Sequence, residues 1–177
     1  MQELFELTGR VAIVTGGAGL LGYYHGAILA AAGAHVVLLD LAQPNPTMRA
    51  AQLTEAHGVE CIGLVADITD EAALNDARDQ IIQKFGRIDI LVNNAANNPK
   101  VEDGTTTWSR LENFPLEVWD ADIRVGLTGA FLCSRIFGTE MMNRGSGVIV
   151  NVASDLAVMA PNQRLYRVDG LPEDQQP

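Results

Sequence analysis

Short apolar runs alternate with amphipathic stretches from residue 10 onward, and this alternation constrains the fold of the chain. Runs such as RVAIVTG at 10–16 and AHVVLLD at 34–40 have the length and composition of buried strands. The stretches between such runs are long enough for the crossover helices that parallel strands require. The sequence therefore predicts an α/β fold, in which repeated βαβ units build a parallel sheet.

The same pattern places the individual elements. Thr47 is expected to cap the second helix and Thr69 to open the third, because threonine oxygen accepts hydrogen bonds from the free N–H groups of a helix start. We expect strands at 10–16, 34–40, 59–67, 87–95 and 147–154, and helices at 21–33, 47–58, 69–86 and 117–142.

The segment TGGAGLLG joins the first strand to the first helix, and residues 17–22 of it spell G-x-G-x-x-G. Glycine permits positive φ and close backbone approach, while the helix start offers free N–H groups to a pyrophosphate. A tight strand-to-helix turn without a ligand is the plainer alternative. The position between strand and helix favours dinucleotide binding by the loop residues Gly16, Gly17, Gly19, Leu20, Leu21 and Gly22.

Asp40 ends the second strand, 18 residues after Gly22, where an acid can accept the adenosine ribose hydroxyls. A carboxylate repels a 2′-phosphate, and residues 41–43 supply no arginine to bind one. NAD is therefore favoured over NADP. An incidental surface aspartate is one alternative, and a methyltransferase that binds S-adenosylmethionine with a similar loop and acid is another.

Composition excludes several other classes of protein. A chain of 177 residues with 47% hydrophobic residues predicts one domain over 1–177. The net charge of -10 argues against a nucleic-acid partner, and no apolar run approaches the roughly 18 residues of a membrane span. With no basic leader, we expect a cytoplasmic protein in which Cys61 and Cys133 are buried thiols. His25 and His57 have no partner spacing, so no metal site is predicted.

Four motifs follow in the order seen in a known family: TGGAGLLG with Asp40, ADIT at 66–69, NNAA at 93–96 and GVIVNVAS at 147–154. In this order the chain resembles the short-chain dehydrogenase/reductase family over essentially its whole length. The resemblance implies a doubly wound Rossmann sheet of order 3-2-1-4-5-6-7 with a ligand crevice at the carboxyl ends of the strands.

The resemblance also implies roles for single residues in cofactor binding. Asp67 and Ile68 would lie beside the adenine, and Asn94, Ala95 and Ala96 would line the cofactor site, while the Asn-Asn-Ala motif stabilises the sheet. The plainer alternatives are that Asp67 caps the helix that follows and that residues 93–94 are ordinary turn residues.

Ser154 matches the catalytic serine of the family, which orients the substrate carbonyl or alcohol. A serine that satisfies backbone groups at a strand end is the alternative. The family's general acid is a tyrosine whose pKa is lowered by a lysine four residues later. Tyr166 is about the right distance from Ser154, but Gly170 stands where that lysine should be, and both lysines of the chain, Lys84 and Lys100, come earlier. The sequence therefore argues against Tyr166 as the catalytic residue.

The segment 155–177 is interpreted as an inserted or terminal loop that precedes the missing tyrosine helix. Family members usually have roughly 250 residues, and strands six and seven have no counterpart here. We therefore expect a C-terminally incomplete member of the family, in which only the strand order 3-2-1-4-5 is present. The resemblance further implies a homodimer or homotetramer.

Two departures from the family pattern and one long loop bear on the chemistry. Gly126 occupies the place of an asparagine that anchors a proton-relay water in many relatives. The glycine loop fits T-G-x-x-G-x-x-G, a spacing of family members that act on nucleotide sugars. The loop 97–116 follows the fourth strand at the crevice and carries Lys100, Trp108 and Arg110, so it is the expected substrate loop, although solvated surface charges are the plainer interpretation of that lysine and arginine.

The leading hypothesis is an NAD-dependent oxidoreductase that transfers hydride between the nicotinamide and an alcohol or ketone. The substrate could be a sugar derivative, since NNPK, VGLTGAFLC and APNQRLYR resemble a branch linked to modified sugars and flagellin glycosylation. Two alternatives stay open: a catalytically silent NAD-binding module, and a nucleotide-sugar epimerase or dehydratase.

Overall fold

In a computed structural model of the chain, residues 5–97, 111–155, 158–160, 162–172 and 176 are described. A parallel sheet contains the strands β1 (Val11–Thr15), β2 (His35–Asp40), β3 (Cys61–Val65), β4 (Ile90–Asn93) and β5 (Val148–Asn151). The strand order is β3-β2-β1-β4-β5, and every neighbouring pair is parallel. This order confirms the predicted Rossmann-type doubly wound sheet.

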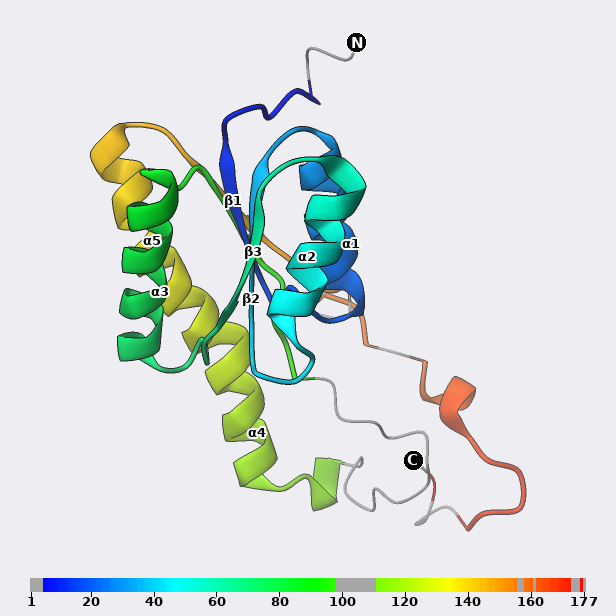
Figure 1. The fold of residues 1–177 in the computed structure, drawn as a ribbon. Coiled ribbons are helices and arrows are strands. Elements are labelled where there is room, and N and C mark those ends of the chain that lie inside the picture. The colour runs from blue at the N-terminus through cyan, green and yellow to red at the C-terminus, as the bar shows by residue number, and fades with distance from the viewer. Residues whose placement is uncertain (1–4, 98–110, 156–157, 161, 173–175, 177) are drawn as a thin grey trace.

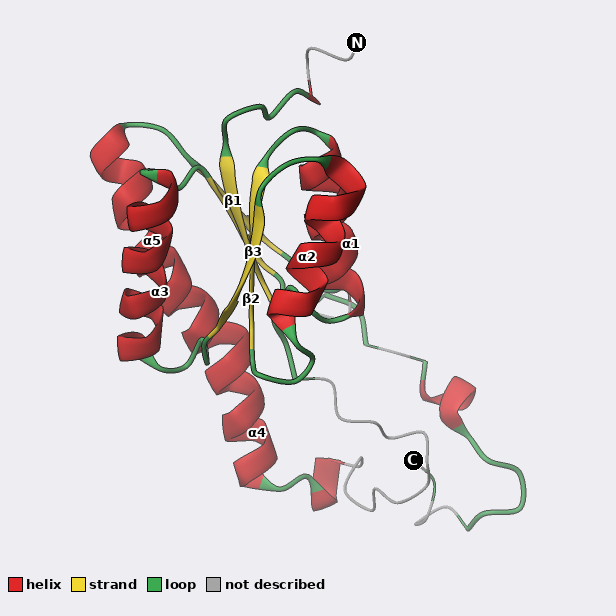
Figure 2. Ribbon diagram, viewed as in Figure 1, coloured by secondary structure: helices red, strands yellow, loops and turns green. Residues whose placement is uncertain are grey.

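Helices cover both faces of the sheet, as Figures 1 and 2 show. The helices α1 (Leu20–Ala31) and α2 (Pro46–His57) lie on one side, and α3 (Glu71–Phe85) and α5 (Ala130–Arg144) lie on the other. Two buried clusters follow from this arrangement, one under each helix layer. The predicted burial of the thiols is confirmed, because Cys61 is 8% and Cys133 0% exposed.

Close packing of α1 on β2 depends on a small residue in the helix. A Cβ added at Gly26 would lie 2.9 Å from the Leu38 Cδ2 and 3.1 Å from the Leu53 Cδ1, so both leucine side chains would have to move to admit a larger residue here. The buried face of α1 is accordingly Gly22, Gly26 and Ala30. This approach fixes the N-terminus of α1 against the carboxyl end of the sheet.

Two helix starts differ from the prediction. The N-cap of α2 is Asn45, whose Oδ1 accepts from the Met48 amide at 3.1 Å, because Pro46 fits the first helical position. Thr47 instead directs its hydroxyl to the Gly63 carbonyl. Asp70, not Thr69, caps α3 and accepts from the amides of the second and third helical residues.

The helix predicted at 117–142 is present but is interrupted. It begins as α4 (Leu116–Ile123), passes through the π-helical turn η3 (Arg124–Gly129) and continues as α5. A short 3-10 turn, η2 (Leu111–Asn113), precedes it. Turns of the π type are rare inside helices and are frequently found at functional sites.

The described residues of the predicted loop 155–177 lie after β5 and away from the sheet in Figure 1. Its described part contains one 3-10 turn, η5 (Gln163–Tyr166), and its described side chains are mostly exposed. β5 is an edge strand, and all of its residues are exposed. Nothing in the described residues continues the sheet beyond β5.

Candidate functional site

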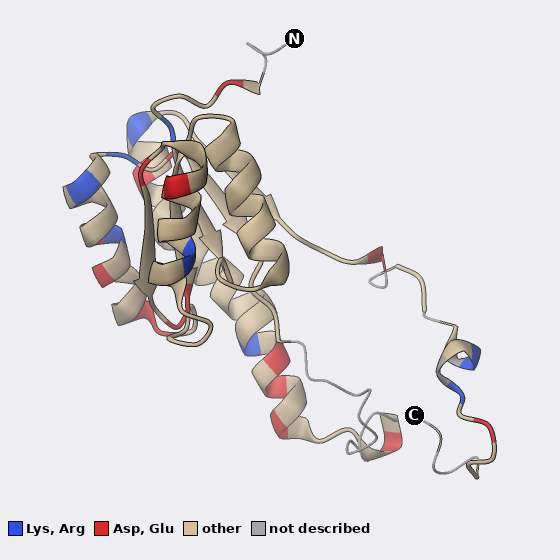
Figure 3. Ribbon diagram, turned by 45° about the vertical axis from the view of Figure 1, so that its right-hand side comes forward, with Lys and Arg blue, Asp and Glu red and all other residues tan. Residues whose placement is uncertain are grey.

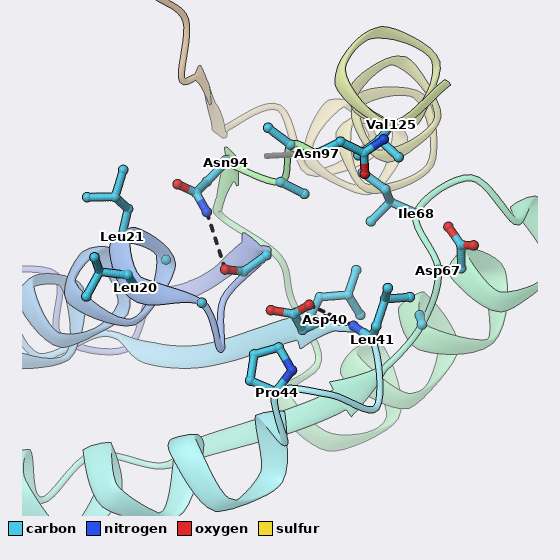
Figure 4. A pocket seen from close by; sticks show the side chains of 17 residues that line it. Leu20, Leu21, Asp40, Leu41, Pro44, Asp67, Ile68, Asn94, Asn97 and Val125 are labelled. Carbon is cyan, nitrogen blue, oxygen red and sulfur yellow. Dashed lines mark hydrogen bonds between the residues drawn. The ribbon is translucent and has the colours of Figure 1, made fainter. Parts of the chain in front are cut away.

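A cavity of about 510 Å³ opens at the carboxyl ends of β1, β2, β3 and β4. This volume lies within the range of small-molecule sites, roughly 300–1,000 Å³. Eleven of the twelve predicted cofactor residues line it: Gly16, Gly19, Leu20, Leu21, Gly22, Asp40, Asp67, Ile68, Asn94, Ala95 and Ala96. Residues from four separate crossovers therefore converge on one cavity, as Figure 4 shows.

The N-terminus of α1 at this cavity differs from those of α2 and α3. Its N-cap is Gly19, which has no capping side chain, and among its described first-turn residues none is acidic. Asn45 and Asp70, by contrast, supply oxygen acceptors to the other two helix starts. The free N–H groups and the positive dipole end of α1 are thus left for an anion beside Gly16 and Gly19.

The glycine loop is too tight for side chains at three positions, Gly16, Gly17 and Gly22. Gly16 has φ +61°, which favours glycine. A Cβ at Gly22 would lie 2.1 Å from the Gly16 carbonyl oxygen, so the first turn of α1 packs directly on the loop backbone. Gly17 does not line the cavity, because its amide donates to the Leu39 carbonyl at 3.2 Å on the strand side of the loop.

The Asp40 carboxylate faces the cavity and holds the loop in place. Its Oδ2 accepts from the Ala18 amide at 2.9 Å, and its Oδ1 accepts from the Leu41 amide at 2.8 Å. Each carboxylate oxygen has about two acceptor sites, so one on each oxygen remains for a further hydroxyl donor. The side chain is therefore able to order the loop and bind a diol together.

A second set of hydrogen bonds joins the loop to β4. The Asn94 Nδ2 donates to the Thr15 carbonyl at 3.0 Å and to the Gly16 carbonyl at 3.3 Å. The Thr15 hydroxyl accepts from the amides of Asn94 and Ala95, at 3.0 and 3.1 Å. These hydrogen bonds fix the part of the cavity wall that lies between β1 and β4. The Asn-Asn-Ala motif predicted a role in the cofactor site but not these partners.

Asn93 bonds away from the cavity, across the sheet and toward α5. Its Nδ2 donates to the Asn151 Oδ1 of β5 at 2.8 Å and to the Ser134 hydroxyl at 3.0 Å. Asn93 is 6% exposed, so these bonds lie in the protein interior. The two asparagines therefore act on different sides: Asn93 ties β4 to β5, while Asn94 supports the cavity wall.

The opposite wall comes from β3 and the π turn. Asp67 does not cap α3, because its Oδ1 accepts from the Thr69 amide at 2.8 Å in a local turn. A Cβ at Gly129 would lie 2.5 Å from the Ile68 side chain, so this glycine brings the π turn onto the wall. Val125 in the same turn lines the cavity. Figure 4 shows Val125 and Ile68 among the side chains that line the cavity.

The structure does not bring the predicted catalytic residues into this cavity. Ser154 lies three residues beyond β5 and donates to the Asp155 carboxylate at 3.3 Å, outside the cavity lining. Tyr166 belongs to η5, with Gly170 four residues later at φ +86°. Lys100, Trp108 and Arg110 of the expected substrate loop lie outside the described residues.

Six lining residues were not among the predicted cofactor residues: Leu39, Leu41, Pro44, Ala66, Asn97 and Val125. Pro44 lies below Asp40 in the loop after β2 (Figure 4). A proline in the loop after the second strand is a signal that could have been used. No sequence signal marks Val125 as a lining residue, because its position at the cavity depends on the π turn.

A cluster of ion pairs around the buried Asp89 lies at the other end of the sheet. Asp89 is 4% exposed and accepts from the Val11 amide at 2.9 Å and from the Arg87 Nε at 2.7 Å. Burial alone would raise the pKa of Asp89, but hydrogen bonds from Arg87, Val11 and Arg10 together lower it. This cluster stabilises the strand ends far from the cavity.

Neither a metal centre nor a membrane span is found in the described parts of the chain. No cluster of three or more His, Cys, Asp or Glu residues there could hold a metal ion. No described helix has the length and apolarity to cross a bilayer.

Comparison with known proteins places the fold and this site in context. Residues 10–166 match the family model described as short chain dehydrogenase. D-threitol dehydrogenase of Mycolicibacterium smegmatis is 35% identical over 161 residues, which cover 91% of this chain and 58% of that protein. The chain therefore spans a little over half the length of that relative.

Solved structures agree with this result. An NAD+-bound xylitol dehydrogenase superposes with a TM-score of 0.78 at 30% identity, covering 87% of this chain and 56% of that one. An NADPH-dependent 3-quinuclidinone reductase from Rhodotorula rubra gives a TM-score of 0.79 at 27% identity, covering 90% and 58%. The two neighbours use different nicotinamide cofactors.

Proposed function

The chain belongs to the short-chain dehydrogenase family, and on that premise we propose that it is the nucleotide-binding part of an NAD-dependent oxidoreductase. The observation that carries the proposal is the pairing of the uncapped α1 N-terminus with the Asp40 carboxylate across one cavity. A dinucleotide needs both: a site for its pyrophosphate and an acceptor for the ribose hydroxyls.

Each part of the cavity has a role in holding this cofactor. The amides after Gly19 bind the pyrophosphate, Asp40 accepts from the adenosine ribose, and Asp67 with Ile68 flanks the adenine. Asn94, Ala95 and Ala96 support the nicotinamide half of the site. The bound nicotinamide supplies hydride chemistry, and the protein supplies placement and proton transfer.

NAD is preferred to NADP because of the surroundings of Asp40. Its carboxylate would repel a 2′-phosphate, and the neighbouring lining residues Leu41 and Pro44 have no side-chain cation to bind one. The NAD+-bound xylitol dehydrogenase supports this choice, while the NADPH-dependent neighbour shows that the family allows both.

The proposed substrate is a polyhydroxylated alcohol or the matching ketone. D-threitol and xylitol, named for two similar proteins, are both polyols. A modified sugar of the kind attached to flagellin is the finer form of this proposal, and the loop 97–116 would contact it. Ser154 is proposed to orient the reacting oxygen.

A catalytically silent NAD-binding module is the second candidate. It is favoured by the 3-10 turn at Tyr166 and by Gly170, which replace a helix carrying tyrosine and lysine. A nucleotide-sugar epimerase is the third, on the spacing of the glycine loop alone.

Incubation with NAD+ and a panel of threitol, xylitol, glycerol and UDP-glucose distinguishes the three functions. NADH that accumulates with a polyol supports the oxidoreductase. Binding of NAD+ without any turnover supports the silent module, and an isomerised nucleotide sugar without net NADH supports the epimerase. Absence of NAD+ binding contradicts all three.

A further inference from the structure

The N-terminus of α2 rests directly on the backbone of β3 at a glycine. Gly63 lies two residues after Cys61, which belongs to the buried cluster under α1 and α2, so Gly63 faces the same helix layer. A Cβ at Gly63 would lie 2.2 Å from the Pro46 carbonyl carbon and 2.3 Å from the Thr47 nitrogen. Non-bonded carbon atoms pack at about 3.5–4.0 Å, and no side-chain rotation relieves an overlap with backbone. The missing side chain at Gly63 therefore sets how closely α2 approaches β3.

Threonine hydroxyls at two points of α2 hold the helix against this strand. At the N-terminal end, the Thr47 hydroxyl donates to the Gly63 carbonyl, with 3.4 Å between Oγ1 and O. Two turns later, the Thr54 hydroxyl accepts from the Cys61 amide at 2.9 Å and donates to the Cys61 carbonyl at 3.3 Å. Cys61 begins β3, whereas the cavity opens at the carboxyl ends of the strands. The Thr54 anchor therefore has the shorter bonds and lies farther from the cavity.

The contact at Gly63 connects two walls of the cavity. Pro44 belongs to the loop 41–45, which leads from β2 into α2, whereas Asp67 follows β3, and both line the cavity (Figure 4). Pro44 is two residues before the buried Pro46. Asp67 is four residues after Gly63. The depth to which α2 docks on β3 therefore sets the separation of the two walls.

From this geometry we propose that Gly63 is a positioning residue for the adenosine end of the cofactor. It does not line the cavity, and it acts through the start of α2, which sets the space between Pro44 and Asp67. The inference rests on the proposed function, because it takes the adenine of NAD+ as the group held in this space. A gap of about 1 Å forfeits up to about half of the dispersion attraction at a contact, so the affinity for a flat ring depends on this separation.

Gly63→Ala tests the proposal with two ligands, NAD+ and etheno-NAD+, in which a third ring is fused to the adenine. The added methyl group would move the start of α2 about 1 Å away from β3 and widen the space. We expect NAD+ to bind about tenfold more weakly, as measured by calorimetry. The bulkier etheno-NAD+ should lose less affinity, so the ratio of its dissociation constant to that of NAD+ should fall by at least about threefold.

Gly147→Ala is the matched glycine control. It adds a Cβ 2.4 Å from the Met141 side chain just before β5, at the end of the sheet opposite the cavity. This substitution should lower the stability against urea and leave the ratio of the two dissociation constants unchanged. A role of Gly63 in stability alone predicts the same behaviour for both glycine variants.

The two threonines give a second test, which decides the question even where Gly63→Ala fails to fold. Thr54→Val removes the anchor with the shorter bonds, and Thr47→Val removes the anchor beside the cavity. We expect Thr54→Val to lose more stability in urea and to keep the wild-type ratio. Thr47→Val should lose less stability and yet lower the ratio, because only this anchor holds the α2 start on Gly63.

The outcomes separate this inference from the proposed function. Wild-type chain that binds NAD+, together with an unchanged ratio in Gly63→Ala and Thr47→Val, contradicts the positioning role alone. Ratios that follow the loss of stability across all four variants contradict it as well. Failure of the folded wild-type chain to bind NAD+ contradicts the proposed function and this inference with it. Circular dichroism confirms which variants are folded.

Discussion

The Asp40 carboxylate at the end of β2 accepts a hydrogen bond from the Ala18 amide in the glycine loop, with 2.9 Å between Oδ2 and N. One side chain thus holds the glycine loop and lines the cavity in which we propose that the adenosine ribose binds. Loss of this acid should therefore disturb the two halves of the adenosine site together.

Asp40→Ala is expected to weaken NAD+ binding by about 10- to 100-fold, since hydrogen bonds to a charged group contribute about 1.5–3 kcal/mol. Calorimetric titration measures the change. NADP+ should lose less affinity, because the repulsion of its 2′-phosphate is removed. Asp79→Ala on the exposed side of α3 is the control, and equal NAD+ affinity in both variants would count against the role of Asp40.

Gly22→Ala and Gly126→Ala form a matched pair of helical glycines. The first adds a Cβ 2.1 Å from the Gly16 carbonyl, whereas the second adds one with no atom within 4 Å. We expect Gly22→Ala to destabilise the chain by about 1–3 kcal/mol and abolish NAD+ binding. Gly126→Ala should be neutral or stabilising by up to about 1 kcal/mol.

Urea unfolding of both variants beside the wild type measures these changes. A Gly22→Ala protein as stable as Gly126→Ala, with NAD+ affinity retained, would show that the loop does not pack as described.

The buried Asp89 predicts how stability depends on pH. Its pKa is lower in the folded chain than the usual 3.8, despite burial, because Arg87, Val11 and Arg10 hydrogen-bond the charged form. The unfolded chain therefore binds more protons as the pH falls toward that usual value. The contribution of Asp89 to the free energy of unfolding is therefore fully present at pH values above its usual pKa. It is lost as the pH falls below that value and through the lower pKa of the folded chain.

Urea unfolding from pH 7 down to pH 3 is the measurement. Asp89→Asn should be less stable at pH 7 and should lose less stability on acidification than the wild type. Parallel pH curves for the two proteins would exclude Asp89 as a source of the acid sensitivity.

Asn93→Ala tests the connection between β4 and β5. It removes donors to Asn151 at 2.8 Å and to Ser134 at 3.0 Å in the interior, which should cost about 1–3 kcal/mol. Hydrogen exchange should speed up most at Val152, whose amide donates to the Asn93 carbonyl. Exchange that changes equally in β1 and β5 would contradict a local role.

Much of the fold could be predicted from the sequence, because buried parallel strands and crossover helices leave a clear pattern. The strand order followed from the family resemblance and is confirmed. Helix starts were harder: Asn45 before Pro46 caps α2, although Thr47 is an equally good capping residue by type. Only the backbone geometry decides between neighbouring candidates.

The residues of the candidate site that belong to local sequence motifs were predicted. The residues that reach the cavity only through long-range packing were missed. The glycine loop and Asp40 are local signals, and they do converge on one cavity. Val125 enters the cavity through a π turn, which has no distinct sequence pattern. The cofactor roles themselves stay predictions, as does the role of Ser154, which lies outside the cavity lining.

Titration of NAD+ and NADP+ into the same preparation of the chain tests the central claim most directly. The uncapped α1 N-terminus and Asp40 predict that NAD+ binds at least about tenfold more tightly than NADP+, a difference of about 1.4 kcal/mol. Tighter binding of NADP+, or no binding of either nucleotide to the folded chain, would contradict the proposed site.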